Sequence, residues 1–339
     1  PLDVLSAAAE AGFGAVGLRV SGRNPGDPWP QPNAEGDGLE RIRARAEALS
    51  IRISSISGYY MSEKTSLSHL LANVEAARRV GAPLSSQGCF EPDPSRVAEL
   101  LRDYARAADD AGVRIALEFM PMSSLKTIAD AQRVIADSGA RNVGLLIDSL
   151  HLARSGAGGA DVRALDARCI HLTQLCDAPA VRAAEPTLFD EAMSGRMYVG
   201  DGGLDLKGLV EALSPDAEIE LETPVIADAT LPGGERARRA AEKAMAFFVS
   251  HFGSGRQPRA YFRPLKAGRC FPRIASTCAA GSGAAKAAAW LAASSAKALC
   301  LSLSSEAFNI ALESATAVGA ARAMRSAMSR ARASSASLA

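Results

Sequence analysis

The chain has 339 residues, of which 48% are hydrophobic, and a formal net charge of +1, so it can bury the core of one large barrel or of two ordinary domains. This near-neutral total does not favour a nucleic-acid partner, although it hides an asymmetry. Residues 1–253 carry about nine excess negative charges and residues 254–339 about ten excess positive charges.

From the N-terminus, short β-like runs alternate with amphipathic helical patterns. The chain opens on a helical pattern, LDVLSAAAEAG, that leads into the first run. Helical segments such as SLSHLLANVEAARRVGA keep apolar residues three and four apart and end at a glycine. The predicted strands are residues 15–20, 51–57, 84–89, 114–119, 143–148, 169–175 and 218–223.

Repeated βα units predict an α/β fold with a parallel sheet, of the (β/α)8 TIM-barrel type. Seven predicted strands are one fewer than a closed barrel of this type contains. Because the sequence begins on a helix, we expect the first strand to be missing from this chain. That loss would leave the edges of the two neighbouring strands unpaired. Since Pro1 is not an initiator residue, the sequence is expected to be a fragment or a processed chain.

The composition changes after residue 253. Residues 254–339 contain 26 alanines, many serines and scattered arginines, and their apolar side chains are small. We therefore expect a barrel domain over residues 1–253 and a low-complexity basic extension over residues 254–339, weakly ordered or loosely helical. A shifted reading frame is one alternative for this extension, and a basic arm that binds nucleic acid or an acidic membrane is another.

The cysteine spacing and the absence of targeting signals concern the location of the protein. Six cysteines show neither CxxC pairing nor zinc-finger spacing, which favours a reduced, cytoplasmic protein. No secretory signal opens the sequence, and no run of about 18 apolar residues predicts a membrane span. We expect no membrane partner.

Four predicted strands carry a metal-binding residue at or near their C-terminal ends, namely Glu118, Asp148, Gln174 and Glu222. In a parallel barrel these ends meet on the face where active sites are built. Three carboxylates and one amide oxygen suit Mg²⁺ or Mn²⁺, with Co²⁺ and Zn²⁺ as competitors. The sequence therefore predicts one divalent-metal site.

Residues that follow the strand ends are candidates for catalysis and substrate binding. His151 stands three residues after Asp148, so it can complete the metal shell, transfer a proton or donate to substrate. Arg154 and Arg196 are the nearest cationic candidates for a substrate carboxylate or phosphate. Asp177 can orient a metal ligand, bind a substrate hydroxyl or cap a turn.

Weaker signals come from an aromatic segment, a glycine-rich segment and two residues whose direction follows from strand parity. Tyr59, within SGYY, is expected either to wall a substrate pocket or to pack in the core. The glycine-rich stretch from Gly195 is either an anion cradle or a plain turn. His171 has the opposite parity to Gln174 and is expected to be structural, whereas Glu220 should point into the barrel, deeper than Glu222.

Several segments together resemble the xylose isomerase-like TIM-barrel superfamily, which includes sugar-phosphate isomerases and epimerases. They read LEFMP, LLIDSLHLARSG, HLTQLCDAP, GDGGLDL and LETP, and the resemblance runs from about Leu2 to His251. The LEFMP and QLCDAP motifs and the glutamine in the third ligand position are similar to those of bacterial 3-dehydroshikimate dehydratases. Two departures indicate an altered pocket, namely Met193 in place of an arginine and Arg19 where relatives carry an acid.

The resemblance implies that Glu118, Asp148, Gln174 and Glu222 are the metal ligands and that His151 contacts substrate or shuttles a proton. We expect a divalent-metal-dependent isomerase or epimerase acting on a sugar, sugar-phosphate or polyol-derived keto substrate. The expected reaction is proton abstraction next to a carbonyl through a metal-stabilised enediolate, with Glu118 and Glu222 as bases. A dehydratase-like lyase and an inactive or truncated barrel stay open as alternatives. The expected partners are this small molecule and a second copy of the chain.

Overall fold

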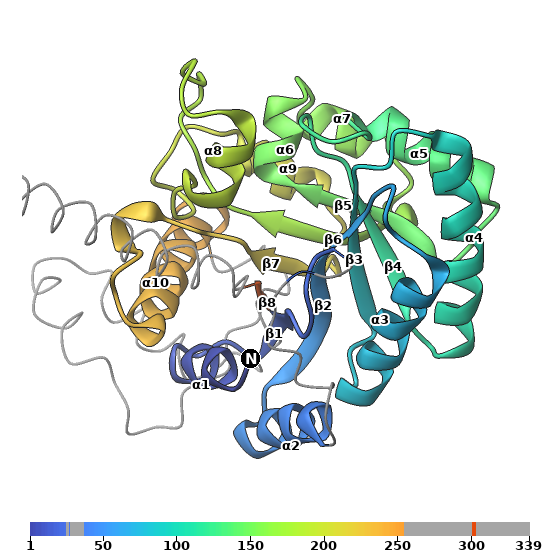
Figure 1. The fold of residues 1–339 in the computed structure, drawn as a ribbon. Helices are drawn as coiled ribbons and strands as arrows, with labels where there is room; N and C mark the ends of the chain where they lie inside the picture. Colours follow the sequence, from blue (N-terminus) through green and yellow to red (C-terminus); the bar gives the residue numbers. More distant parts are fainter. Residues whose placement is uncertain (25–26, 28–36, 254–299, 303–339) are drawn as a thin grey trace, which may run out of the picture.

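The computed structural model describes residues 1–24, 27, 37–253 and 300–302. Eight parallel strands form a closed barrel in the order β1 to β8, with helices around it (Figure 1). The seven strands and the opening helix predicted from the sequence are confirmed. The strands are β1 (Ala15–Leu18), β2 (Arg52–Met61), β3 (Leu84–Cys89), β4 (Arg114–Glu118), β5 (Val143–Asp148), β6 (Ile170–Leu175), β7 (Ile219–Leu221) and β8 (Cys300–Ser302).

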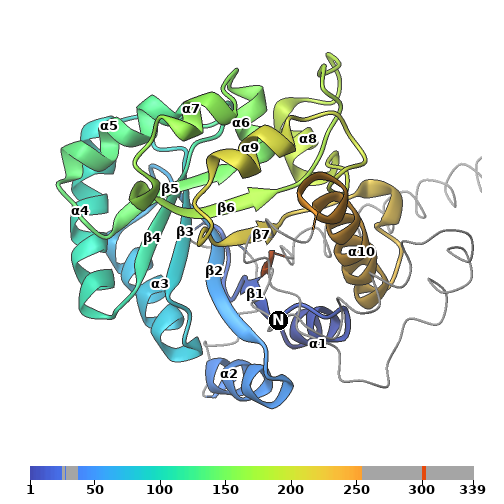
Figure 2. The same ribbon diagram turned by 180° about the vertical axis from the view of Figure 1, so that it is seen from behind.

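Helices follow most of the strands and pack around the outside of the barrel, as the views from the two sides show (Figure 2). The first helix packs against the last, which brings the N-terminal residues beside the end of the barrel domain. Ten α-helices lie within the described residues. They are α1 (Leu2–Glu10), α2 (Gly38–Leu49), α3 (Leu67–Val80), α4 (Pro94–Asp110), α5 (Ile128–Ser138), α6 (Ser149–Arg154), α7 (Gly159–Arg163), α8 (Leu188–Ser194), α9 (Leu206–Ala212) and α10 (Gly233–Phe252).

Local sequence sets where these helices begin and end, as α5 shows. The Thr127 hydroxyl accepts a hydrogen bond from the N–H of Asp130, and the Asp130 carboxylate accepts one from the N–H of Thr127. This reciprocal cap satisfies amide groups that the first turn cannot pair. The helix ends at Gly139, whose φ of +67° places it in the left-handed region that glycine adopts without strain.

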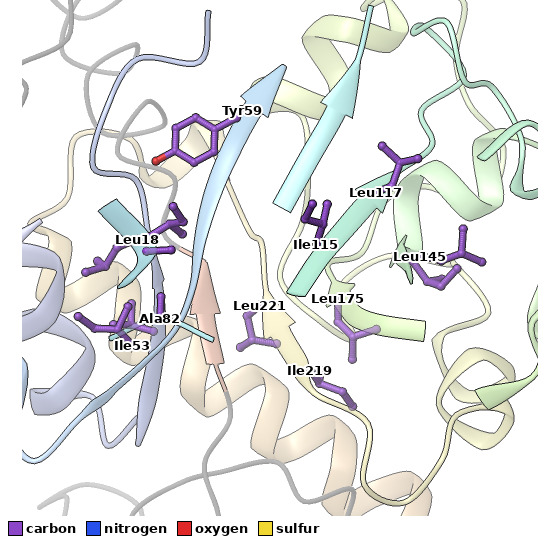
Figure 3. Packing of buried hydrophobic residues seen from close by; sticks show 14 of the residues in the cluster. Leu18, Ile53, Tyr59, Ala82, Ile115, Leu117, Leu145, Leu175, Ile219 and Leu221 are labelled. Atoms are coloured by element: carbon purple, nitrogen blue, oxygen red, sulfur yellow. The ribbon is translucent and has the colours of Figure 1, made fainter. Parts of the chain in front are cut away.

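Strand alternation separates two layers of the core. On β5, Leu145 and Ile147 belong to the large cluster between the barrel and its helices, whereas Leu146 belongs to a small cluster with Leu84, Ala116 and Leu172. Figure 3 shows members of the larger cluster, among them residues of β4, β5, β6 and β7. Because side chains alternate along a strand, Asp148 shares the direction of Leu146. The same counting directs the side chains of Glu118 on β4, Gln174 on β6 and Glu222 after β7 into the barrel interior.

The strand β8 closes the barrel between β7 and β1. Its backbone pairs in parallel with both, with Leu301 level with Val16 and with Leu221. The position expected to be vacant after loss of the first strand is therefore filled by residues from the basic extension. A strand there was not expected, and the rest of the extension, residues 254–299 and 303–339, lies outside the described residues.

Within the described ranges, none of the helices combines the length and the apolar character needed to cross a membrane.

Candidate metal and substrate site

Three carboxylates converge at the carboxyl end of the barrel. Glu118 ends β4, Asp148 ends β5 and Glu222 follows β7, and one oxygen of each lies within 4.8 Å of the others. Asp148 is fully buried, while the side chains of Glu118 and Glu222 are 15% and 17% exposed. The cluster therefore has a deep member and two members that face an opening.

Repulsion and burial govern how these carboxyl groups ionise. Burial, reinforced by the charges of Glu222 and Asp148, raises the pKa of Glu118 well above its usual range. Burial also raises the pKa of Glu222, although the Arg196 guanidinium opposes the rise. For Asp148, burial alone would raise the pKa, but Arg196 and the neighbouring donors outweigh it and the pKa is lowered. A bound cation would relieve the repulsion that holds protons on the first two groups.

Arg196 is the buried cation of the cluster. Its Nη1 lies 2.6 Å from Asp148 Oδ2, and its Nη2 lies 3.3 Å from Glu222 Oε2. Its Nε donates to the Ala192 carbonyl at 2.9 Å, which ties the guanidinium to the end of α8. Arg196 therefore bridges two of the three carboxylates. This arginine, which the sequence analysis named as a candidate for substrate binding, lies inside the site.

Gln174 lies level with Glu220 in the register of β6 and β7. Its amide nitrogen donates to Glu220 Oε2 at 3.1 Å, and Glu220 also accepts from the Ser55 hydroxyl at 2.7 Å. Because a carboxylate only accepts, this bond directs the amide oxygen of Gln174 away from Glu220. Gln174 lines a cavity together with Glu118 and Glu222. Glu220 is fully buried, so it lies deeper than Glu222, as strand parity predicted.

His151 lies on the first turn of α6, where its backbone N–H donates to Asp148 Oδ1 at 3.0 Å. Its Nε2 stands 3.7 Å from Glu118 Oε1, and its side chain is buried. Burial lowers the pKa of His151 to about 4, although the Asp148 charge opposes this. The histidine beside the cluster is therefore a neutral imidazole near pH 7.

Two adjoining cavities, of about 380 and 420 Å³ with their open mouths included, lie over the carboxylates. They share Arg23, Tyr60, Glu118 and Glu222 and so form one continuous depression. The first contains Arg19 and small polar groups, and the second adds an apolar wall. This wall consists of Phe90, Met120, Met122, Phe189, Ala192, Met193 and Pro224.

Arg154 and Asp177 are engaged within the chain. Arg154 forms a two-point ion pair with Glu191, with N–O distances of 3.0 and 2.7 Å, and it does not line either cavity. The Asp177 carboxylate accepts from the backbone N–H groups of Ala178, Gly200 and Leu204. The amides of the glycine-rich stretch therefore hold an anion that belongs to the chain itself.

The structure corrects the aromatic candidate. Tyr59 is 2% exposed and packs in the large core cluster with Leu18 and Ile53 (Figure 3), whereas Tyr60 lines both cavities. The register of β2 against β3 shifts between Ile56 and Tyr59, and Gly58 has a φ of +81°. This irregularity breaks the alternation on which counting along the strand depends. Sequence reasoning also missed Arg23, which follows β1 without any periodic pattern to mark it.

The donor set fits a hard divalent cation. Three carboxylate oxygens lie within a few ångströms of one another, and the amide oxygen of Gln174 is directed away from its only described side-chain partner, Glu220. Oxygen ligands of this kind suit Mg²⁺ and Mn²⁺. The described residues bring no cysteine or second histidine to the triad, so softer metals gain no ligand there.

A closed parallel barrel with an acidic cluster and a cavity at the carboxyl ends of its strands is of the TIM-barrel class, whose active sites are built on that face. Residues 5–250 match the model of the xylose isomerase-like TIM barrel, so the chain belongs to that family.

Two curated relatives are inosose isomerases. The protein of Bacillus velezensis is 30% identical over 118 residues, which are 34% of this chain and 40% of the relative. The protein of Bacillus subtilis (strain 168) is 28% identical over 161 residues, which are 45% of this chain and 55% of the relative. The chain thus spans about half the length of the curated relatives it matches.

Among solved structures, the IolI protein with a bound zinc atom superposes with a TM-score of 0.61. The superposition covers 74% of this chain and 93% of that one, at 17% identity. At this identity the likeness concerns the fold.

Proposed function

We propose that the protein is a divalent-metal-dependent isomerase or epimerase of a sugar-like keto substrate, such as an inosose or a keto-sugar. The observation that carries the proposal is the convergence of Glu118, Asp148 and Glu222 within 4.8 Å at the floor of an open cavity. The inosose isomerase relatives support the class of substrate and reaction.

We assign the ligands as Glu118, Asp148, Gln174 and Glu222. A divalent ion held there, with Mn²⁺ and Mg²⁺ preferred and Co²⁺ or Zn²⁺ as alternatives, would supply Lewis acidity toward adjacent carbonyl and hydroxyl oxygens of the substrate. Within the chain, Gln174 is oriented by Glu220, so its oxygen needs no reorganisation to act as a donor.

The proton transfers fall to groups at the cavity. Glu118 and Glu222 are the members of the cluster that face the opening, so one can remove a proton next to the carbonyl and the other can return it. His151, a neutral imidazole 3.7 Å from Glu118, can donate a hydrogen bond from its ring N–H to a developing alkoxide. Arg196 can hold a substrate oxygen from its position between Asp148 and Glu222.

Metal analysis of the purified protein is the first test. We expect about one divalent ion per chain, lost in Glu118→Ala and Gln174→Ala and kept in Glu218→Ala, which removes a carboxylate that pairs with Arg52 outside the site. Absence of metal after reconstitution with Mn²⁺ would contradict the proposal and leave an inactive barrel.

Turnover in deuterium oxide then identifies the reaction. An isomerase or epimerase incorporates solvent deuterium next to the substrate carbonyl, which proton NMR of inososes and ketohexoses detects. A dehydratase-like lyase instead releases water from dehydroshikimate and forms a conjugated product, and this result would replace the isomerase assignment with the lyase.

A further inference from the structure

The second cavity beside the carboxylate cluster has an apolar wall that four separate segments build. Phe90 follows β3, Met120 and Met122 follow β4, Phe189, Ala192 and Met193 belong to α8, and Pro224 follows β7. The proposed metal site and proton transfers use none of these residues. Apolar side chains from four segments thus meet on one side of a cavity, as they do in pockets that hold apolar groups of a ligand.

Packing of the core does not account for this wall. Phe189 is 46% exposed, and Phe90 and Met193 are only partly buried. Among the described residues, the hydrophobic core clusters include neither these three nor Met120 and Pro224. The wall also does not exclude water by itself, because the Phe189 ring is in contact with water. An apolar group that covers the wall removes this contact, which favours binding.

Contacts within the chain hold part of the wall in place. The rings of Tyr60 and Phe90 meet edge to face, with their centres 4.9 Å apart and their planes at 71°. A Cβ at Gly88 would stand 2.8 Å from both Met120 Cε and Tyr60 Cδ1, so the lack of a side chain there lets both groups pack over β3. Groups that are already held in this way lose less conformational freedom when a ligand covers them.

The charged side chains of the second cavity lie at the carboxylate cluster. Arg196 contacts Asp148 and Glu222 there. Arg23 acts on the charges of Glu118 and Glu222. The phenylalanine, methionine, alanine and proline side chains of the wall have no N–H or O–H group to donate. A hydroxyl group placed against them loses its water without gaining a partner, so this side of the cavity suits hydrocarbon better than a hydroxylated carbon.

The wall is continuous with the candidate active site, because Glu118 and Glu222 line both cavities. A sugar ring held over the carboxylates would therefore extend its far end onto the wall. We propose that the substrate is a keto-sugar that carries an apolar substituent, an alkyl or aryl group, and that the wall binds this group. The inference rests on the proposed function and narrows its substrate class. Phe189 and Met193 of α8 are then residues that determine specificity.

Calorimetric titration of the Mn²⁺-loaded protein tests the proposal with methyl and phenyl β-D-glucoside, which share one sugar ring and carry no free carbonyl that could react. Each buried methylene group favours binding by roughly three- to fourfold, so we expect the phenyl glucoside to bind about tenfold or more tightly. Phe189→Ser should reduce this preference, and Phe189→Ser combined with Met193→Gln should abolish it. Val181→Ser should leave it unchanged, because Val181 is 85% exposed in the connection between β6 and α8 and lines neither cavity.

The bound Mn²⁺ also reports where each part of the ligand lies, because the paramagnetic ion relaxes the nearest protons most strongly. We expect faster relaxation of the sugar protons than of the phenyl protons in proton NMR of the phenyl glucoside. Equal affinity for the two glucosides, a preference that survives in the double variant, or the reverse order of relaxation overturns the inference.

Two further measurements separate the inference from its alternatives. If the phenyl preference is absent and Phe189→Ser lowers the molar mass measured by light scattering, the wall is a contact with a second copy of the chain and the inference is wrong. Manganese content of the same samples reports on the proposed function. A protein that takes up the metal without preferring the phenyl glucoside loses only the apolar substituent, and a protein that takes up none loses both proposals.

Discussion

Glu220 and Gln174 form a buried pair beneath the carboxylate cluster, and the pair determines which end of the amide faces the cavity. A glutamate at position 174 would set two carboxylates against each other at a separation near 3 Å, which a buried site tolerates only by keeping a proton. The neutral glutamine avoids this conflict. Glu220 is therefore a positioning residue for Gln174, the amide ligand of the proposed metal site.

Replacing Glu220 by glutamine tests this positioning. The Gln174 amide could then turn over, so the metal ligand would lose its fixed direction, and Mn²⁺ affinity should fall about 10- to 100-fold. Isothermal titration measures the affinity, and circular dichroism checks that the fold is kept. Glu218→Gln serves as the matched control, because Glu218 precedes the same strand and pairs with Arg52. An unchanged Mn²⁺ affinity in a folded Glu220→Gln protein would contradict the positioning role of Glu220.

His171 is a structural histidine whose titration affects stability. Its Nδ1 lies 2.8 Å from the Ile115 carbonyl oxygen, and because a carbonyl only accepts, Nδ1 is the donor. Burial lowers the pKa of His171 below the ordinary value of about 6.5. The imidazole therefore has a pKa near 6.5 in the unfolded chain and a lower pKa in the folded chain. At pH values between the two, the unfolded chain binds more protons than the folded chain does. The contribution of His171 to stability is therefore full above about pH 6.5 and is lost as the pH falls through that window.

We expect His171→Phe to lower the melting temperature at pH 7.5, because the Ile115 carbonyl loses its donor at a cost of roughly 1–3 kcal/mol. The further drop in melting temperature between pH 7.5 and 5.5 should be smaller in this variant than in the unchanged protein. Thermal melts across that range provide the measurement, with the exposed His69→Gln as control. Equal slopes in all three proteins would contradict the assignment.

At the scale of single elements, sequence patterns predicted what depends on local periodicity and failed where tertiary contacts decide. The ends of β4, β5 and β7 could be located because one residue in two faces inward and parallel strands end on one face. Tyr59 and Tyr60 could not be assigned by counting, because Gly58 interrupts β2. The partner of Arg154 is Glu191, 37 residues further on, and no spacing rule connects them.

The loop that follows Arg196 is an element whose conformation rests on Asp177. Three backbone N–H groups donate to the Asp177 carboxylate at 2.9 to 3.1 Å, and the Asp177 backbone pairs with that of Met197. Gly202 permits the close approach, since a Cβ there would stand 2.4 Å from Asp177 Oδ1. The structure thus supports the turn-capping alternative for Asp177 over direct contact with substrate.

Asp177→Asn should lower the melting temperature whether or not metal is present. The NH2 group of asparagine would face backbone N–H groups, and two hydrogen-bond donors cannot pair with each other. The expected cost is about 1.5–3 kcal/mol, which corresponds to several degrees in a domain of this size. Differential scanning calorimetry with and without Mn²⁺ measures it. Asp201→Asn, in the same loop but paired with the exposed Lys243, should shift the melting temperature far less. A loss of substrate affinity without a loss of stability would restore the binding role for Asp177.

For the molecule as a whole, the sequence predicted the barrel but not how it closes. Seven strands and their helices could be predicted from the repeated alternation of strand and helix patterns in the sequence. In contrast, β8 is three residues long and follows a segment without this alternation. Its position between β7 and β1 depends on two unpaired strand edges that come together only in the folded barrel. A signal of that kind does not exist in the local sequence.

A proline at position 301 tests the closing strand. Leu301→Pro removes the N–H that a strand paired on both sides needs, so we expect a destabilisation of about 3 kcal/mol and a greater tendency to aggregate through exposed edges. Leu301→Val keeps the N–H and a β-forming side chain and is the control. Urea unfolding and light scattering measure the two effects. Equal behaviour of both variants would show that stability does not depend on β8.

The depth of the carboxylates has a consequence for the order of events in a working cycle. Asp148 is fully buried and Gln174 nearly so, while Glu118 and Glu222 lie at the opening through which the cavity meets solvent. A cation bound to this set would lie beneath a substrate in the cavity, so we expect the metal to enter first and leave last. Loss of Mn²⁺ to a chelator should therefore slow as sugar ligand is added, and the occupied protein should exchange its metal only as fast as the sugar dissociates.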